Sequence, residues 1–291
     1  MLTRILFYLL LYPLSLLSMK VLYGISYIFY LIIAYIIRYR SKIIDQNLRN
    51  SFPEMSAEEL RKIKFKNYRH LADLAAEMIK MLSISRKNLM KRYHCLNPEL
   101  VNQYADAGKS VILMSSHLNN WEWMVLSLDL QFKHQGIGVG APNSNKVFEL
   151  IINRFRTRYG TQVVFADKIR EEVQRRDEQH IPTLYMMLSD QSPPNAKQSY
   201  KTTFLHQPSA MLYGSEYFAG KYNFPVLYYE VMKIKRGYYT IEIQEITDNP
   251  AQCQHGEIIE NYVQLLERSI RKQPEFWLWS HKRWKHKITL V

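Results

Sequence analysis

The sequence predicts an α/β protein with a mixed, largely parallel sheet flanked by helices, behind an N-terminal membrane helix or hairpin. From residue 110 onward, short apolar segments alternate with segments of helical periodicity, as in strands joined by helices. Residues 5–37, in contrast, are almost entirely apolar and aromatic. No Ser- or Gly-rich linker follows them. We therefore predict a membrane anchor at residues 1–40 and one domain at residues 41–291.

The N-terminal segment is apolar over a length that suits a bilayer. Residues 21–37 carry no charge, and as a helix they would reach about 26 Å, against a bilayer core of roughly 30 Å. The segment is therefore expected either to span the membrane or to lie deep in one leaflet. Arg38, Arg40 and Lys42 follow directly, and the positive-inside tendency places them and the rest of the chain in the cytoplasm. The alternative is a helical hairpin buried in a soluble core.

The domain shows separate signals for its helices and strands. A capping box from Ser56 to Glu59 predicts the start of a helix, whose apolar residues recur at helical spacing at Leu60, Ile63, Leu71, Leu74, Met78 and Leu82. Short apolar runs predict strands at 110–115, 136–139, 162–165 and 182–188. Helical periodicity predicts helices at 119–130, at 145–159, between the last two of these strands, and at 257–272. Arg236-Gly237 predicts the turn of a hairpin that joins strands 224–234 and 238–246.

Composition limits the possible functions. Lys and Arg number 39 against 26 Asp and Glu, a net charge of +13, which predicts an anionic partner such as a membrane surface, nucleic acid, or an acidic carrier or substrate. Cys95 and Cys253 are far apart and outside any CxxC pair, so we expect neither a disulfide framework nor a thiolate zinc site. The chain has no HExxH, zinc finger, RNP-like strand or glycine-rich phosphate loop, so we expect no metal, cofactor or nucleic acid. A non-catalytic polyanion-binding protein remains a distant alternative.

Chemistry-bearing residues are concentrated in the stretch Ser-Ser-His-Leu-Asn-Asn-Trp-Glu at 115–122. His117 follows an apolar strand, and Glu122 lies about 140° away from it on a continuous helix, so the two can meet only if His117 is in the loop or first turn. In that arrangement Glu122 would orient the imidazole while the other ring nitrogen accepts a proton. No GxSxG nucleophile elbow occurs. We therefore predict general-base catalysis without a covalent enzyme intermediate.

Three further features have two readings each. Arg156 and Arg158 border opposite edges of the apolar stripe of helix 145–159; each is either the functional arginine or an ordinary solvated charge, and the pattern does not decide which of the two is functional. Asp190 follows a strand, where α/β sites form, so it either contacts substrate or stabilises the turn. Segment 277–287 interleaves Trp with Lys and Arg, which fits either a phospholipid headgroup boundary or a packed terminal segment.

The motif His117-x4-Glu122 within HLNNWE, behind an apolar N-terminus, resembles the bacterial lipid A late acyltransferases, the lauroyl and myristoyl transferases of the glycerolipid acyltransferase superfamily. Further blocks agree in order and spacing: Asn47-Leu48, Phe52-Pro53, Arg156-x-Arg158-x-Gly160, Asp190-Gln191, Pro274-Glu275 and residues 277–285. The resemblance covers nearly the whole chain. It implies a glycerol-3-phosphate acyltransferase-like fold and transfer of a fatty acyl group from an acyl carrier protein thioester to a hydroxyl of a lipid A precursor at the inner membrane. His117 would be the base and Glu122 its partner.

The same resemblance implies that Asn120, Arg156, Arg158 and Asp190 bind substrate. An arginine suits a phosphate or a developing oxyanion because its planar fork donates two hydrogen bonds. The chain departs from the family where Leu118 and the Phe204-Leu205-His206 stretch stand in place of glycines. The alternative acceptors are a lysophospholipid, an aminolipid or another glycolipid.

Overall fold

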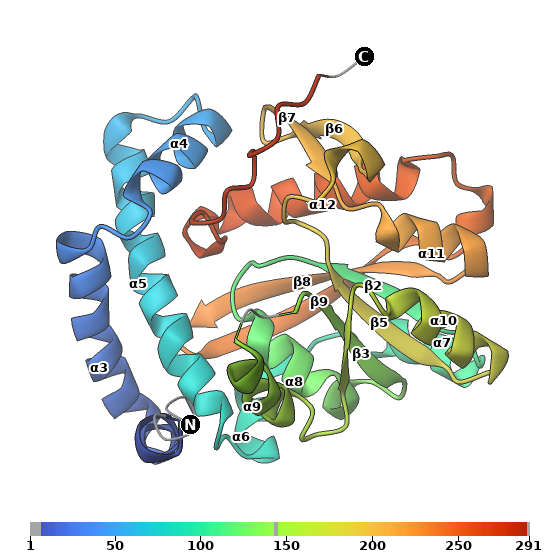
Figure 1. Cartoon of the computed structure of the whole chain (residues 1–291), viewed down its shortest axis with the longest axis horizontal. Coiled ribbons are helices and arrows are strands. Elements are labelled where there is room, and N and C mark those ends of the chain that lie inside the picture. Colours follow the sequence, from blue (N-terminus) through green and yellow to red (C-terminus); the bar gives the residue numbers. More distant parts are fainter. Residues whose placement is uncertain (1–6, 143–144, 290–291) are drawn as a thin grey trace.

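A seven-stranded sheet forms the centre of the protein. The computed structural model describes residues 7–142 and 145–289 (Figure 1). In spatial order the strands are β1 (Tyr93–Cys95), β9 (Tyr238–Thr247), β8 (Val226–Lys235), β2 (Val111–Ser115), β5 (Thr183–Leu188), β3 (Gln135–Gly140) and β4 (Gln162–Phe165). Neighbouring strands are parallel except β8 and β9, which form an antiparallel hairpin. The predicted mixed, largely parallel α/β fold is confirmed.

The two faces of the sheet carry separate apolar layers. Side chains alternate along a strand, so Ile112 and Met114 of β2 face one core cluster while Val111 and Leu113 face the other. The first cluster includes residues of α4 (Ser41–Ser51), α10 (Ile169–Glu178), α11 (Gly214–Tyr222) and α12 (Glu257–Lys272). The second includes residues of α6 (Arg86–Arg92), α7 (Glu99–Asp106), α8 (Trp121–Gln131) and α9 (Lys146–Arg156). Helices therefore cover both faces, and the central strands are buried.

The apolar N-terminal segment forms broken helices beside the domain. A short η1 (Phe7–Leu11) and α2 (Tyr12–Leu16) precede α3 (Met19–Leu31) and η2 (Ile32–Ile36), and Ser18 caps α3. Within the described residues, Met19–Ile36 is the one helix long and apolar enough to cross a membrane. Residues 5–6 of the predicted segment lie outside the described part.

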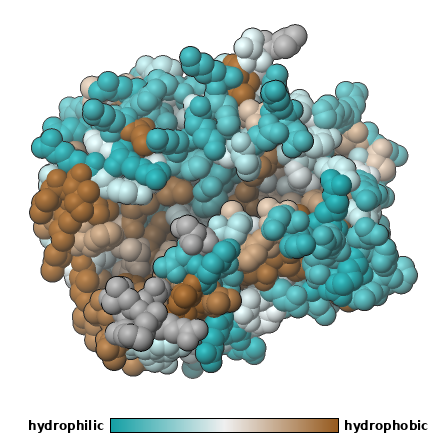
Figure 2. Space-filling model, viewed as in Figure 1, coloured by the Kyte–Doolittle hydropathy of each residue, from teal (hydrophilic) through white to brown (hydrophobic). Residues whose placement is uncertain are grey.

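One face of α3 packs on α5 (Ala57–Met81), and the other is exposed. Leu22 and Tyr23 are buried against α5, whereas Ile25 and Ile28 are 41% and 60% exposed. Figure 2 shows the apolar side chains gathered over this edge of the molecule. A helical hairpin buried in a soluble core is therefore not what the chain forms.

Most predicted elements form near their predicted positions. The capping box of Ser56 and Glu59 begins α5, β4 and α12 have the predicted bounds, and Gly237 turns the β8–β9 hairpin with φ of +70°. The helix expected from about residue 119 begins at Trp121, because Asn119 has φ of +62° and Asn120 is the N-cap. The prediction omitted several elements, namely α4, α6, α7, α11, β1 and the hairpin of β6 (Tyr200–Phe204) and β7 (Gln207–Met211).

The β6–β7 turn contains the Phe204-Leu205-His206 stretch, where the family pattern has a glycine. Leu205 and His206 both have positive φ, +48° and +64°, as in the tight hairpin turns that favour glycine. The Leu205 side chain is fully buried and that of His206 is exposed. The backbone thus keeps a glycine-type conformation although neither residue is glycine.

Replacing His206 by Gly is expected to stabilise the protein slightly. Relief of the left-handed strain, about 1–2 kcal/mol, exceeds the extra chain entropy of glycine, about 0.5–1 kcal/mol, so the free energy of unfolding should rise by about 0.5 kcal/mol. Denaturant unfolding measures it. Lys201→Gly, at an exposed position in strand β6, should instead lower the free energy of unfolding. A loss of stability in His206→Gly would contradict this expectation.

Candidate active site

The central strand β2 carries the catalytic candidate to the carboxyl edge of the sheet. His117 stands two residues after β2, in the loop before α8, as its predicted role requires. The backbone N–H of Asn119 donates to the carbonyl of Phe276 (3.1 Å), and Leu118 forms an isolated β-bridge with Trp277. The loop is therefore held against the C-terminal segment.

Asp190 is the carboxylate that contacts His117. The imidazole Nδ1 lies 2.7 Å from Oδ1 of Asp190, and the backbone N–H of His117 donates to Oδ2 (2.9 Å). The parallel register pairs Ser115 of β2 with Leu188 of β5. His117 and Asp190 each stand two residues beyond that pair, so the two strand ends bring them together.

Asp190 is held in its ionised form. Its carboxylate is buried, and the indole N–H of Trp277 also donates to Oδ2 (2.8 Å). Burial alone would raise the pKa of Asp190, but the charge and hydrogen bonds of His117, together with Trp277, lower it below its ordinary value. An ionised Asp190 fixes the proton of the ring on Nδ1, which leaves a lone pair on Nε2.

The second ring nitrogen of His117 faces a replaceable partner. The side-chain amide nitrogen of Gln191 lies 3.1 Å from Nε2, and the His117 side chain is 16% exposed. Beside it, burial lowers the pKa of His281 to about 4, so this second histidine is neutral at neutral pH. The arrangement provides one general base, with Nε2 as the basic atom.

Glu122 does not contact the imidazole. Its two carboxylate oxygens accept hydrogen bonds from Nε (2.8 Å) and Nη2 (2.6 Å) of Arg156. Glu122 lies in the first turn of α8 and Arg156 at the end of α9, so its side chain is directed to the neighbouring helix. The predicted contact between Glu122 and the imidazole of His117 is therefore wrong, and Asp190 makes that contact instead.

The other predicted substrate-binding residues are engaged with the protein itself. Arg158 donates to the backbone carbonyls of Leu82 and Ile84, which ties the end of α9 to the loop after α5. Asn120 caps α8 by accepting from the N–H of Trp123 (2.9 Å) and donates through Nδ2 to Glu77 (2.6 Å). Arg156 is bound to Glu122. The structure thus brings His117 and Asp190 together and places these three residues in structural contacts.

The C-terminal segment is packed against the domain. Trp277, Trp279 and Arg283 are at most 2% exposed. Within residues 277–287 the exposed residues are the three lysines, Lys282, Lys285 and Lys287. The headgroup-boundary reading of this segment is therefore wrong for Trp277, Trp279 and Arg283. Trp277 serves the site through its hydrogen bond to Asp190.

Glu77 of α5 joins the apolar helix to the catalytic loop. Its side chain is fully buried and accepts from the hydroxyls of Tyr23 (2.7 Å) and Tyr239 (2.8 Å) and from Asn120 (2.6 Å). Burial raises the pKa of Glu77. Glu77 was not among the predicted site residues. Asp73 and Glu77 lie four residues apart on the buried face of α5, where a carboxylate is rarely found without a partner.

Replacing Glu77 by Leu is expected to destabilise the protein by about 3 kcal/mol or more. Three buried donors lose their acceptor, and each unsatisfied group costs roughly 1–3 kcal/mol. Denaturant unfolding of the detergent-solubilised chain measures the change. Glu178→Leu, on the exposed side of α10, is the control and should stay within about 0.5 kcal/mol of wild type. Equal stability of the two variants would contradict the role of Glu77.

Within residues 7–142 and 145–289, no group of three His, Cys, Asp or Glu side chains is placed to hold a metal ion. A comparison with curated proteins gives no match. The sequence profile of bacterial lipid A biosynthesis acyltransferases matches residues 2–286. By this match over nearly its whole length, the chain belongs to the bacterial lipid A biosynthesis acyltransferase family, a family of enzymes that transfer acyl groups.

Proposed function

We propose that the protein transfers a fatty acyl group from an acyl carrier protein thioester to a hydroxyl of a lipid A precursor, at the cytoplasmic face of the inner membrane. The observation that carries this proposal is the His117–Asp190 pair at the carboxyl ends of β2 and β5, in a chain of this family. A histidine with one nitrogen fixed by a buried carboxylate and the other directed outward is suited to removing a proton from a hydroxyl.

The proposed reaction needs no covalent enzyme intermediate. The acceptor hydroxyl displaces the Gln191 amide and gives its proton to Nε2 of His117, while the hydroxyl oxygen attacks the thioester carbonyl. Asp190 stabilises the imidazolium that forms. The tetrahedral intermediate then collapses, the carrier thiol departs with the proton from Nε2, and the acyl ester remains on the acceptor.

In this proposal Glu122 and Arg156 act as one hydrogen-bonded pair. The bidentate pair joins the first turn of the catalytic helix α8 to the end of α9, so it fixes where α8 begins relative to His117. We assign both as positioning residues. Arg158 and Asn120 have a less direct role. Arg158 holds the backbone of the loop after α5, and Asn120 caps α8.

The proposed location rests on the exposed apolar face of α3 and on charge. Arg38, Arg40 and Lys42 follow the apolar helix, and cationic flanks favour the cytoplasmic side. Residues 1–40 would form the anchor and residues 41–291 the acyltransferase domain. The net charge of +13 suits an acidic carrier protein, whose attraction salt would screen.

Mass spectrometry of lipids tests the acceptor. A strain lacking the protein should accumulate lipid A short of one acyl chain, and wild type, but not His117→Ala, should restore it. Unchanged lipid A with a change in lysophospholipid, aminolipid or another glycolipid would replace the acceptor and keep the chemistry. To test the donor, the carrier thioester is compared with the coenzyme A thioester at low and high salt. Equal use of both thioesters, without a salt effect, would contradict the carrier assignment.

A further inference from the structure

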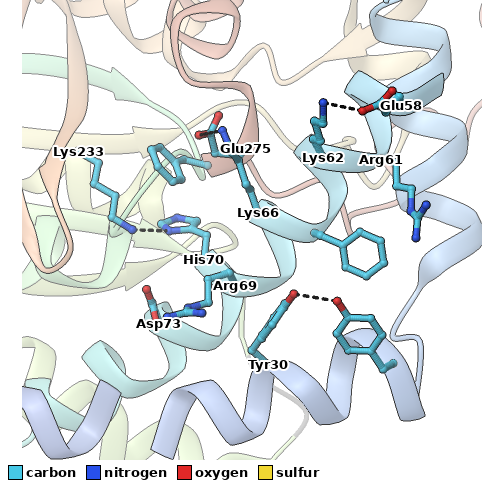
Figure 3. A pocket seen from close by; sticks show the side chains of 13 residues that line it. Tyr30, Glu58, Arg61, Lys62, Lys66, Arg69, His70, Asp73, Lys233 and Glu275 are labelled. Carbon is cyan, nitrogen blue, oxygen red and sulfur yellow. Dashed lines mark hydrogen bonds and ion pairs between the residues drawn. The ribbon is translucent and has the colours of Figure 1, made fainter. Parts of the chain in front are cut away.

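A pocket of about 700 Å³ opens between α5, the end of the apolar helix and the C-terminal segment. Neither His117 nor Asp190 lines it. Its walls carry five cationic side chains, three carboxylates, four aromatic rings and a histidine: Arg61, Lys62, Lys66, Arg69, Lys233, Glu58, Asp73, Glu275, Tyr30, Tyr35, Phe65, Phe276 and His70. Figure 3 shows the side chains of α5 lining this opening opposite Tyr30.

The carboxylates of the pocket are already neutralised. Glu58 pairs with Lys62 (2.7 Å), Glu275 with Lys66 (3.5 Å), and Asp73 with Arg236, which stands outside the pocket lining. Three ion pairs therefore account for all three anions. The other cations of the lining, Arg61, Arg69 and Lys233, remain as surplus positive charge.

The surplus cations have no anionic partner among the described residues. The guanidinium of Arg69 lies over the rings of Tyr27 and Tyr30, and that of Arg61 over Phe65. Neither arginine makes an ion pair within the described part of the chain. Lys233 forms no ion pair within the described part of the chain; its ammonium lies 3.4 Å from a neutral ring nitrogen of His70 and over the Phe276 ring. Burial lowers its pKa, although the charges of Glu77, Asp73 and Glu275 act in the opposite direction. Neither Arg61 nor Arg69 makes a hydrogen bond within the described part of the chain, and each guanidinium suits a phosphate, which accepts paired hydrogen bonds.

The position of the pocket indicates where that phosphate comes from. Tyr30 and Tyr35 join their hydroxyls (3.3 Å) at the end of the apolar helix, whose exposed side carries Ile25, Ile28 and other large apolar residues. An exposed apolar face belongs among acyl chains, and tyrosines and arginines belong at headgroup depth. The pocket therefore opens at the level where lipid phosphates lie.

The pocket also adjoins the catalytic loop. Phe276 lines it, and the Phe276 carbonyl accepts from the N–H of Asn119, two residues from His117. The arginines that the sequence pointed to as phosphate ligands are engaged elsewhere, Arg156 with Glu122 and Arg158 with backbone carbonyls. A phosphorylated lipid at His117 would thus find its free cations on α5.

We infer that this pocket binds phosphates of membrane lipid headgroups, one at Arg61 and one at Arg69, because the two arginines stand eight residues, or about 12 Å, apart on α5. The inference rests on the membrane location in the proposed function, and not on the acyl transfer itself. The phosphates come either from the acceptor or from phospholipids of the surrounding bilayer, and both present the same chemistry to the two arginines.

Binding without turnover tests the inference. The full-length chain in neutral detergent micelles is titrated with a phosphorylated disaccharide lipid, its dephosphorylated form, phosphatidylglycerol, phosphatidylcholine and inorganic phosphate. Arg61→Gln/Arg69→Gln is compared with Lys109→Gln/Lys221→Gln, which makes the same charge change at exposed positions after α7 and in the last turn of α11. Figure 1 shows both helices across the molecule from α5. Arg61→Gln alone, at an exposed side chain with no hydrogen bond in the described part, repeats the test without risk to the fold.

We expect wild type to bind at least one phosphate-bearing anionic lipid about tenfold or more tightly than phosphatidylcholine or the dephosphorylated lipid. The arginine double variant should weaken that binding about 10- to 100-fold, because a hydrogen bond to a charged group is worth about tenfold or more. Arg61→Gln should weaken it about three- to tenfold, and the lysine double variant less than twofold. Preference for the phosphorylated disaccharide identifies the acceptor as the source, and preference for phosphatidylglycerol identifies the bilayer.

Wild-type lipid affinity in the arginine variants, or an equal loss in the lysine variant, would overturn the inference. Inorganic phosphate that competes as well as the lipids do would overturn the lipid assignment. Because no acyl transfer is measured, a failure of the proposed reaction leaves these outcomes unchanged.

Discussion

Replacing His117 by Ala is expected to lower kcat by about 10²- to 10⁴-fold, the usual value of general-base assistance. Asp190→Asn should cause a loss of similar size. The carboxylate that fixes the proton on Nδ1 would become an amide, and its N–H₂ can donate to Nδ1 and move the ring proton to Nε2, the wrong tautomer for a base. Acyl transfer by the purified chain in micelles measures both effects.

Trp277→Phe provides a graded control for Asp190. It removes one hydrogen bond to Oδ2 and keeps an aromatic ring, so its loss of kcat should be clearly smaller than that of Asp190→Asn. Thermal unfolding in the same micelles confirms that each variant is folded. A folded Asp190→Asn protein with wild-type kcat would remove Asp190 from the mechanism.

Glu122→Gln and Arg156→Gln are each expected to lower kcat/KM by about 10- to 100-fold, and the double variant by no more than the larger single loss. Each substitution breaks the same bidentate pair, so the effects should not add. Because Arg156 is 30% exposed, the loss of stability should stay below the 3–5 kcal/mol of a fully buried pair. The cycle is completed by measuring kcat/KM and the free energy of unfolding for wild type, the two single variants and the double variant.

A second cycle separates the two carboxylates. Glu122 and Asp190 have no shared hydrogen-bond partner among their contacts, so the effects of Glu122→Gln and Asp190→Asn should multiply. Non-additivity in this cycle, with additivity between Glu122 and Arg156, would restore Glu122 as the partner of His117.

Local patterns predicted the longer strands and several of the helices of the domain, but not which strands are neighbours. The end of β2 and the end of β5 were both recognisable, and His117 and Asp190 were each identified there. Their contact depends on β2 and β5 pairing directly, although β3 and β4 lie between them in the chain. Periodicity within a segment carries no information on that order. The predicted partner of His117 was therefore Glu122, a carboxylate close to it in sequence.

Burial also decided features that composition left open. The Trp and Arg residues of the C-terminal segment have the composition of a membrane boundary, yet Trp279 is fully buried and its indole N–H donates to the Pro274 carbonyl. Glu77 is polar, yet three donors from separate parts of the chain make it a core residue. In both cases tertiary partners, which lie far away in sequence, determine the environment.

Transfer of a labelled acyl group tests the central claim most directly. Wild type and His117→Ala are incubated in micelles with acyl carrier protein that bears a labelled fatty acyl thioester, together with a lipid A precursor, and the lipids are separated. The account predicts label in ester linkage on the precursor with wild type, with a rate at least 10²-fold lower for His117→Ala. Label that stays on the carrier, or that enters the precursor equally fast with both proteins, would contradict it.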